Sequence, residues 1–171
     1  DERVRVFHQK NSGCTAASLL GLQEAAGDYI MFVDSDDYVE TEMLWEMMKH
    51  LVGKKGEVVC CNHILEKKRT TLPAVCPAAP GIYEGEKLKK EIKNKLIGNE
   101  QRTIPLSRCM KLFEKSVFEG NEKFRDTSIL MGDDLTVVFP AMLNSTRVVV
   151  MKDALFYHYR YVENSTVHGY L

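Results

Sequence analysis

The stretch Tyr29-Ile30-Met31-Phe32-Val33-Asp34-Ser35-Asp36-Asp37 decides the fold class of this chain and its candidate chemistry. Its first five residues are apolar, with aromatic and branched side chains, and predict a buried strand. Its last four include three carboxylates, whose like charges repel and whose ionised forms are disfavoured by burial. A cation among the carboxylates would offset both costs. The pattern therefore predicts a cation site directly after a strand.

The ligand types favour a hard ion at this site. Oxygen ligands without Cys or His nearby suit Mg²⁺ or Mn²⁺, which proteins commonly hold with one or two carboxylates and the phosphates of a substrate. We therefore expect a nucleotide-diphosphate site at the C-terminal end of an α/β sheet, where open sheets bind ligands. A turn with a helix cap would explain one Asp, but explains three poorly.

Length and composition favour one soluble domain, or one domain with a small appendage. The chain has 171 residues and a formal net charge of -1, which gives no broad attraction to nucleic acid. It contains no apolar run long enough to span a bilayer and no visible signal peptide. Its five cysteines form no Cys-x-x-Cys pair. We expect reduced, mostly buried thiols and a cytoplasmic location.

Hydrophobic periodicity predicts alternating strands and helices in the first part of the chain. The expected elements are a short strand over 4–7, a helix over 15–26, the strand over 29–33, a helix that Thr41 caps, and a strand over 57–65. The second helix should direct five apolar residues inward: Met43, Leu44, Met47, Met48 and Leu51. This βαβαβ alternation predicts a mixed, mostly parallel sheet flanked by helices.

The rest of the chain is less regular. We expect a surface excursion or lid over 67–81, an amphipathic helix over 85–97, and an ordered segment over 110–113. A helix over 134–143, kinked at Pro140, should precede strands over 148–151 and 155–159. As a single domain over 1–171, the chain divides into a donor-side segment (1–65), a lid and acceptor-side excursion (66–130), and a C-terminal segment (131–171).

Asp133 and Asp134 form a second acidic candidate, just before the helix over 135–143. Carboxylates at a helix N-terminus also satisfy free N–H groups and the macrodipole, so a capping role is an equal alternative. Glycosyl transfer with inversion needs a carboxylate that takes the proton of the acceptor hydroxyl. It also needs a metal at the leaving diphosphate. The two acidic sites could supply these two parts.

Two weaker candidates lie elsewhere. Asn11 and Gly13 belong to a glycine-containing loop before a helix, which can approach phosphate closely or act as a plain turn. Arg160 could contact a diphosphate bidentately. The aromatic residues around it, over 157–161, could stack on a base or sugar or pack on the sheet. His158 is more simply a structural histidine than a metal ligand, and residues 163–166 follow this stretch.

Together these residues resemble the family 2 glycosyltransferases, which have the GT-A fold. The resemblance rests on Asn11-x-Gly13-x3-Ala17-x3-Gly21, on Ala26-Gly27-Asp28-Tyr29-Ile30 running into the acidic cluster, on Lys111-Leu112-Phe113, on Asp133-Asp134-Leu135, and on the C-terminal stretch. It covers nearly the whole chain in the same order.

The resemblance implies transfer of a hexosyl or N-acetylhexosaminyl group from a nucleotide-sugar, usually a UDP-sugar, to a saccharide or lipid-linked acceptor. It places the metal-binding Asp-x-Asp motif on Asp34 and Asp36, with Asp37 adjacent, and the general base on Asp134. Donor contacts would involve Asp34, Asn11, Gly13 and Arg160. Family context implies polysaccharide synthesis at the inner face of a membrane, with possible peripheral association.

The chain departs from the family pattern at three places. The N-terminal portion that binds the nucleoside is absent before residue 1, so we expect an unpaired sheet edge. Ser18-Leu19 replaces a frequent Arg-Asn, and Asp133 replaces a Glu. A non-catalytic remnant or interaction module of GT-A fold is therefore the alternative to a metal-dependent inverting glycosyltransferase. A nucleotidyltransferase would need a basic glycine-rich phosphate loop, which the sequence lacks.

Overall fold

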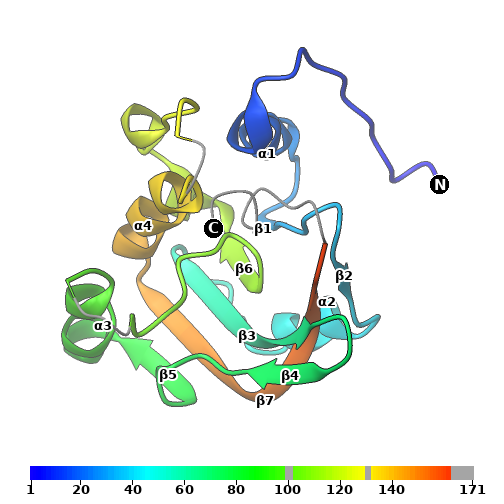
Figure 1. Cartoon of the computed structure of the whole chain (residues 1–171). Helices are drawn as coiled ribbons and strands as arrows, with labels where there is room; N and C mark the ends of the chain where they lie inside the picture. Colours follow the sequence, from blue (N-terminus) through cyan, green and yellow to red (C-terminus); the bar gives the residue numbers. More distant parts are fainter. Residues whose placement is uncertain (99–101, 130–131, 163–171) are drawn as a thin grey trace.

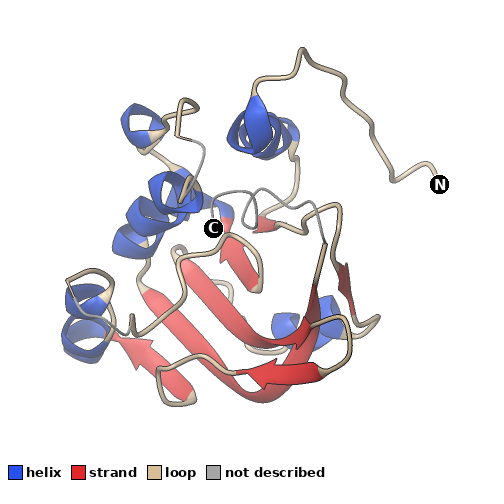
Figure 2. Cartoon of the chain, viewed as in Figure 1, coloured by secondary structure: helices blue, strands red, loops and turns tan. Residues whose placement is uncertain are grey.

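The computed structural model describes residues 1–98, 102–129 and 132–162. Its centre is one mixed sheet in which neighbouring strands follow the order β1-β6-β3-β7-β2 (Figures 1 and 2). These strands are β1 (Tyr29–Met31), β6 (Lys111–Glu114), β3 (Glu57–Glu66), β7 (Arg147–Arg160) and β2 (Tyr38–Val39). Two shorter strands extend it: β4 (Thr71–Ala74) pairs with β3, and β5 (Gly81–Glu84) pairs with β7.

Helices cover both faces of this sheet. The four α-helices are α1 (Gly13–Glu24), α2 (Met43–Met48), α3 (Gly85–Glu91) and α4 (Asp134–Asn144), and three 3₁₀ segments are η1 (Lys93–Lys95), η2 (Lys115–Phe118) and η3 (Glu122–Phe124). Strand β3 shows why two faces form. Val58 and Cys60 belong to a core cluster with α1, α3 and α4, whereas Val59 and Cys61 belong to a second cluster with α2. Alternate side chains of a strand point to opposite faces.

The expected mixed α/β sheet with flanking helices is confirmed, but its pairing is not mostly parallel. Among the described strands, β3 and β7 pair in parallel, and the other five pairs are antiparallel. The reason lies in residues 66–118. This region returns to the sheet three times, as β4, β5 and β6, and each of these strands pairs antiparallel to its neighbour. The segment over 67–81 is therefore tied to β3 through β4 and is not a free lid.

The predicted strand over 4–7 is wrong. Residues 1–10 form an extended segment without strand pairing (Figure 1), which contacts the end of α1 through Arg5 and Glu24. Val4 and Val6 are 68% and 71% exposed. An extended segment becomes a strand only when it pairs with another, and no described strand lies beside it. Strand β1 has one pairing partner, β6, and so forms the end of the described sheet. On its other side β1 has no pairing strand among the described residues.

Two further details of the helices and strands differ from expectation. In α2, Met43 and Met47 are buried, but Leu44 and Met48 are 49% and 45% exposed, because a helix this short buries only one stripe of its surface. Its N-cap is Glu42, not Thr41. The two strands predicted over 148–151 and 155–159 are one strand, β7, with an irregular register against β3.

Three further predicted elements are confirmed. The strand over 57–65 is β3, the helix over 15–26 is α1 with shifted ends, and the helix over 134–143 is α4, which contains Pro140. The amphipathic helix over 85–97 is α3 followed by η1. Its three predicted apolar positions, Leu88, Ile92 and Leu96, are all buried.

Candidate active site

The acidic turn after β1 lies against the C-terminal part of β7. Tyr157 links the two, although its side chain is fully buried. Its hydroxyl accepts a hydrogen bond from the backbone N–H of Asp34 at 3.2 Å and donates one to Asp37 Oδ2 at 2.6 Å. The backbone N–H of Arg160 donates to Asp37 Oδ1 at 2.9 Å. Both carboxylate oxygens of Asp37 are therefore engaged in holding the turn to the sheet.

The other two carboxylates of the turn differ in environment. Asp36 is exposed, and Asp34 is half-buried. Burial raises the pKa of Asp34, and the negative charges of Asp134 and Asp37 add to this rise, whereas Cys109 and Arg108 oppose it. Because its ionised form is disfavoured in this way, the Asp34 carboxylate would be stabilised by a cation bound beside it.

Within the described ranges, no group of three or more His, Cys, Asp or Glu side chains has the arrangement of a metal site. The acidic turn thus does not form a closed, all-protein metal cage. Both carboxylate oxygens of Asp37 already accept hydrogen bonds, which leaves the carboxylates of Asp34 and Asp36 to bind an ion. This donor set fits an ion such as Mg²⁺, which keeps open positions for substrate phosphates and water.

The second acidic candidate lies at the start of α4. Asp133 Oδ2 accepts hydrogen bonds from the Thr15 hydroxyl of α1 and from Arg108 Nη2, the latter at 2.6 Å. Arg108 Nε also forms an ion pair with Asp134 Oδ1. The guanidinium group therefore joins both carboxylates, and the start of α1 is joined to the start of α4.

The pKa values of the two adjacent carboxylates are shifted in opposite directions. Burial tends to raise the pKa of Asp133, but the Thr15 hydroxyl and Arg108 outweigh it and the pKa lies below its ordinary value. For Asp134, burial is the largest effect and raises the pKa, even though Arg108 opposes it. Asp133 is thus stabilised as an anion, whereas Asp134 is held closer to protonation and has the greater capacity to accept a proton.

Arg108 connects the two acidic candidates electrostatically. Its charge acts on Asp34 as well as on Asp133 and Asp134, and the charge of Asp134 is felt at Asp34. The structure therefore brings together acidic residues that lie far apart in the sequence. Sequence reasoning missed Arg108 because no motif contains it. One signal was present: a single basic residue between the buried, mostly apolar residues Leu106 and Cys109 implies a carboxylate partner.

The weaker candidates, Asn11, Gly13 and Arg160, make local or backbone contacts in the structure. Helix α1 begins at Gly13, whose φ is 87°, and Asn11 Oδ1 accepts a hydrogen bond from its N–H at 3.1 Å. This contact is a local turn, and a phosphate contact at this loop stays a prediction. Arg160 is exposed and contacts the acidic turn through its backbone, so a role of its guanidinium group also stays a prediction. Residues 163–166 lie outside the described residues.

His158 has a structural environment, as expected. Its ring stacks on Tyr38 with centroids 4.2 Å apart, and its two nitrogens lie 2.9 Å from carboxylates of Glu40 and Glu66. Burial lowers its pKa, but the two carboxylates outweigh burial and the pKa is raised. The cluster fixes β2 to β7 just after the acidic turn.

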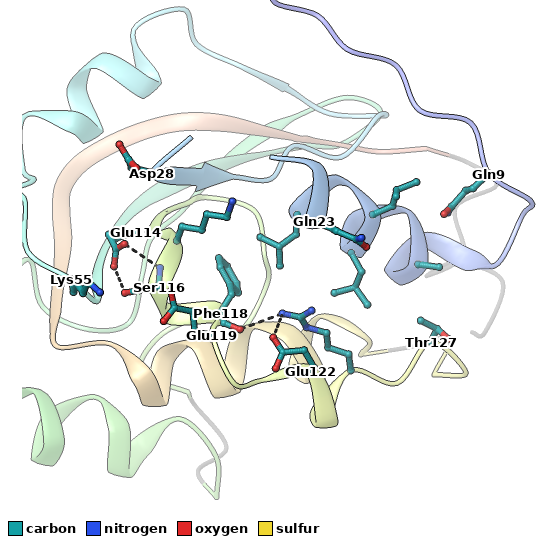
Figure 3. Close-up of a pocket in the computed structure, with 16 residues that line it drawn as sticks. Gln9, Gln23, Asp28, Lys55, Glu114, Ser116, Phe118, Glu119, Glu122 and Thr127 are labelled. Atoms are coloured by element: carbon teal, nitrogen blue, oxygen red, sulfur yellow. Dashed lines mark hydrogen bonds and ion pairs between the residues drawn. The ribbon is translucent and has the colours of Figure 1, made fainter. Parts of the chain in front are cut away.

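A groove of about 500 Å³ leads to Asp34. It runs between α1 and β1, and Cys14, Ser18 and Ser35 also line it. Figure 3 shows a larger pocket, of about 840 Å³, which lies between α1 and the η2–η3 region. That pocket contains none of the predicted site residues, and charged side chains such as Glu119 and Glu122 line it. The smaller groove is the one continuous with the acidic turn.

Long apolar helices are missing from the part of the chain that the structure describes: none there has the length and hydropathy needed to cross a membrane.

Comparison with known proteins identifies relatives of one kind. The model of "Glycosyl transferase family 2" matches residues 1–120. An uncharacterized glycosyltransferase, EpsJ of Bacillus subtilis, is 29% identical over 167 residues, which are 96% of this chain and 47% of EpsJ. Glycosyltransferase GlyG of Streptococcus pneumoniae is 42% identical over 64 residues, which are 37% of this chain and 21% of GlyG.

Solved structures agree with these relatives. TarS of S. aureus, residues 1–349, superposes with a TM-score of 0.68 at 20% identity, covering 90% of this chain and 42% of that structure. Its complex with UDP-GlcNAc superposes with a TM-score of 0.66 at 20% identity, covering 95% and 43%. This likeness shows a shared fold. The chain spans about half the length of EpsJ and of this TarS structure. Because the family model covers most of the chain, this protein belongs to glycosyl transferase family 2.

Proposed function

We propose that this chain provides the metal and acceptor side of an inverting glycosyltransferase that uses a nucleotide-sugar donor. One observation carries the proposal: Asp34, at the acidic turn, and Asp134, at the start of α4, belong to a single charged cluster around Arg108. A metal-binding carboxylate and a base must lie on the two sides of one reacting sugar carbon.

The donor is proposed to be a UDP-sugar. TarS shares the fold of this chain, and its crystal structures include complexes with UDP and with UDP-GlcNAc. The transferred group would be a hexosyl or N-acetylhexosaminyl unit, and the acceptor a saccharide or a lipid-linked molecule. These finer assignments, like a role in polysaccharide synthesis at the cytoplasmic face of a membrane, come from family resemblance.

Asp34 and Asp36 are the residues that would hold Mg²⁺ or Mn²⁺. The charge balance supports this assignment, since Arg108 acts on three carboxylates, Asp34, Asp133 and Asp134. When bound, the ion would neutralise charge on the leaving diphosphate. Tyr157 and the backbone of Arg160 hold Asp37 and keep the turn in place for this contact.

Asp134 is the proposed general base. Its carboxylate would take the proton of the acceptor hydroxyl while the acceptor oxygen forms a bond to the anomeric carbon and the bond from that carbon to the diphosphate breaks. Asp134 is better suited than Asp133, because Asp133 Oδ2 already accepts from Thr15 and Arg108.

The test is turnover of UDP-sugars by the full-length gene product that carries this chain, with Asp134→Asn and Asp133→Asn as paired variants. Asp134→Asn should lower kcat by about 10²-fold or more, the range expected for loss of a general base. Removal of divalent cations with a chelator should abolish turnover, and Mg²⁺ or Mn²⁺ should restore it. Parent-level kcat for Asp134→Asn would remove this residue from the role of base.

A further inference from the structure

Arg108 uses one edge of its guanidinium group to contact two carboxylates that are adjacent in the sequence. Its side chain is 4% exposed. Nη2 donates to Asp133 Oδ2 at 2.6 Å, and Nε forms an ion pair with Asp134 Oδ1. The hydrogen bond to Asp133 fixes this edge, and the close ion pair with Asp134, which has no hydrogen-bond partner at Nε or Oδ1 among the described residues, is placed by it. A lysine ammonium group cannot present two nitrogens along one edge in this way.

The two carboxylates are held unequally. Asp133 also accepts from the hydroxyl of Thr15, a residue only 3% exposed, so the Asp133 side chain is anchored from two sides. The Asp134 side chain is 28% exposed, and Arg108 is the cation with which it pairs among the residues that the structure describes. Asp133 therefore fixes the arginine, and the arginine fixes a carboxylate that reaches toward solvent.

We propose that Arg108 is a positioning residue for the transfer reaction: anchored on Asp133, it orients the Asp134 carboxylate and keeps it ionised for proton abstraction. This inference rests on the proposed function, because it assigns Arg108 a role in the action of Asp134 as base. It gives the Asp133–Asp134 pair a division of labour, in which the first residue is an anchor and the second reacts.

The groups around Asp134 determine in which direction its pKa should move when a neighbour is replaced. The groups that face it are Arg108 and Cys109 on the loop before β6, Asp34 after β1, and its neighbour Asp133. The carboxylates and burial favour the protonated form of Asp134, and Arg108 opposes them. Loss of Arg108 should therefore make Asp134 harder to ionise, and loss of the Asp133 charge should make it easier.

The experiment measures kcat and KM against pH for the full-length protein at saturating metal ion. In Arg108→Met, the acidic limb of the kcat profile should move up by about one pH unit or more, which is the usual effect of losing an adjacent opposite charge. The donor KM should stay within about twofold. In Asp133→Asn, the limb should move down instead. Arg108→Lys should restore the position of the limb but not the full kcat, because one of the two contacts is lost.

Arg147 offers a matched control. It is also a buried arginine paired with a carboxylate, with Nη1 2.9 Å from Glu57 Oε1 and a side chain 7% exposed, but it lies at the other end of the sheet. Arg147→Met should lower Tm at least as much as Arg108→Met and leave the acidic limb in place. If Arg108→Met is too unstable to assay, two expectations remain testable. Asp133→Asn should move the limb down, and Arg108→Lys should lower kcat with the limb in its parent position.

A second readout does not depend on activity. The ¹³C signal of the Asp134 carboxyl group, assigned with Asp134→Asn, should titrate at higher pH in Arg108→Met than in the parent. An unchanged titration together with an unchanged limb would overturn the inference and leave Arg108 a structural residue. Full activity of Asp134→Asn would instead overturn the proposed base, and the ¹³C titration would then still report whether Arg108 controls this carboxylate.

Discussion

Two buried arginines lie at opposite ends of the parallel strands, and their surroundings differ in charge. Arg147, at the start of β7, pairs with Glu57, at the start of β3. Arg108 lies at the other end, where β1 finishes and β6 begins, and interacts electrostatically with Asp34, Asp133 and Asp134. At the first end the described ion pairs join two cations, Arg147 and Lys54, to two carboxylates, Glu57 and Glu84. The second has an excess of negative charge.

The polar groups at the first end satisfy one another. Glu57 is fully buried and accepts hydrogen bonds from the backbone N–H groups of Val52 and Lys54, and Arg147 also donates to the carbonyl oxygen of His50. Such a closed network stabilises one arrangement of the chain but offers nothing to a ligand. The unbalanced carboxylates at the second end reduce stability unless a cation or a substrate completes them, which is typical of functional sites.

The largest effect is expected at the closed end. Glu57→Gln would remove the buried carboxylate that pairs with Arg147 and leave only the half-exposed Glu84 beside the guanidinium group. We expect a loss of about 3 kcal/mol in the free energy of unfolding. Urea denaturation monitored by circular dichroism would measure it. Affinity for UDP per folded molecule should stay unchanged, because this pair lies away from the acidic turn.

Glu122 provides the control for that measurement. Its ion pair with Arg125 is 3.6 Å long, and its side chain is 66% exposed. Glu122→Gln should change the free energy of unfolding by no more than about 0.5 kcal/mol. Equal effects of the two substitutions would contradict the distinction between a closed structural pair and a solvated one.

How much the sequence could predict differs between these two ends. The acidic turn was predictable because its three carboxylates directly follow an apolar strand, so one local stretch contains both signals. Strand β3 and the buried face of α3 were predictable for the same reason, from local periodicity. Arg108 was not, since its meaning depends on Asp133 and Asp134, which are distant in sequence and adjacent only after folding.

The incorrect predictions also concern features that depend on contacts between distant parts of the chain. The segment over 4–7 has the composition of a strand, but strand formation depends on a partner that composition does not specify. Strand β4 contains Pro73 and lies in a region read as a lid, yet β3 is long enough to pair with it beyond the end of β6. The exposed Leu44 shows that an apolar residue on a short helix need not face the core.

A smaller effect is expected at the functional end, where Tyr157→Phe would remove one hydroxyl group. The backbone N–H of Asp34 would lose its acceptor, and Asp37 Oδ2 would lose its donor. The hydroxyl is protonated at any neutral pH, because burial and the Asp37 carboxylate raise the pKa of Tyr157. We expect a loss of about 1–3 kcal/mol in stability and a clear rise in the KM for the donor, measured with the full-length protein.

Tyr159→Phe is the matched control for Tyr157→Phe. Tyr159 lies two positions along the same strand and is 39% exposed. Its substitution should leave unfolding and the donor KM close to those of the parent. If Tyr157→Phe lowered stability and left the donor KM unchanged, the contact between Tyr157 and the acidic turn would be purely structural, and the contrast between the two ends would weaken.

The smallest effect concerns pH and His158. Its folded-state pKa is raised by Glu40 and Glu66, so its stabilising contribution is complete below the unfolded pKa of about 6.5 and is lost as pH rises through the folded value. The parent minus His158→Gln difference in Tm should therefore shrink between pH 6 and pH 8.5, by about 2 °C or less. Scanning calorimetry across this range would measure it, with His50→Gln, an exposed residue, as control. A difference that grows with pH would mean that His158 is neutral in the folded protein. The charges of Glu40 and Glu66 would then be unbalanced and would add to the excess negative charge at the functional end.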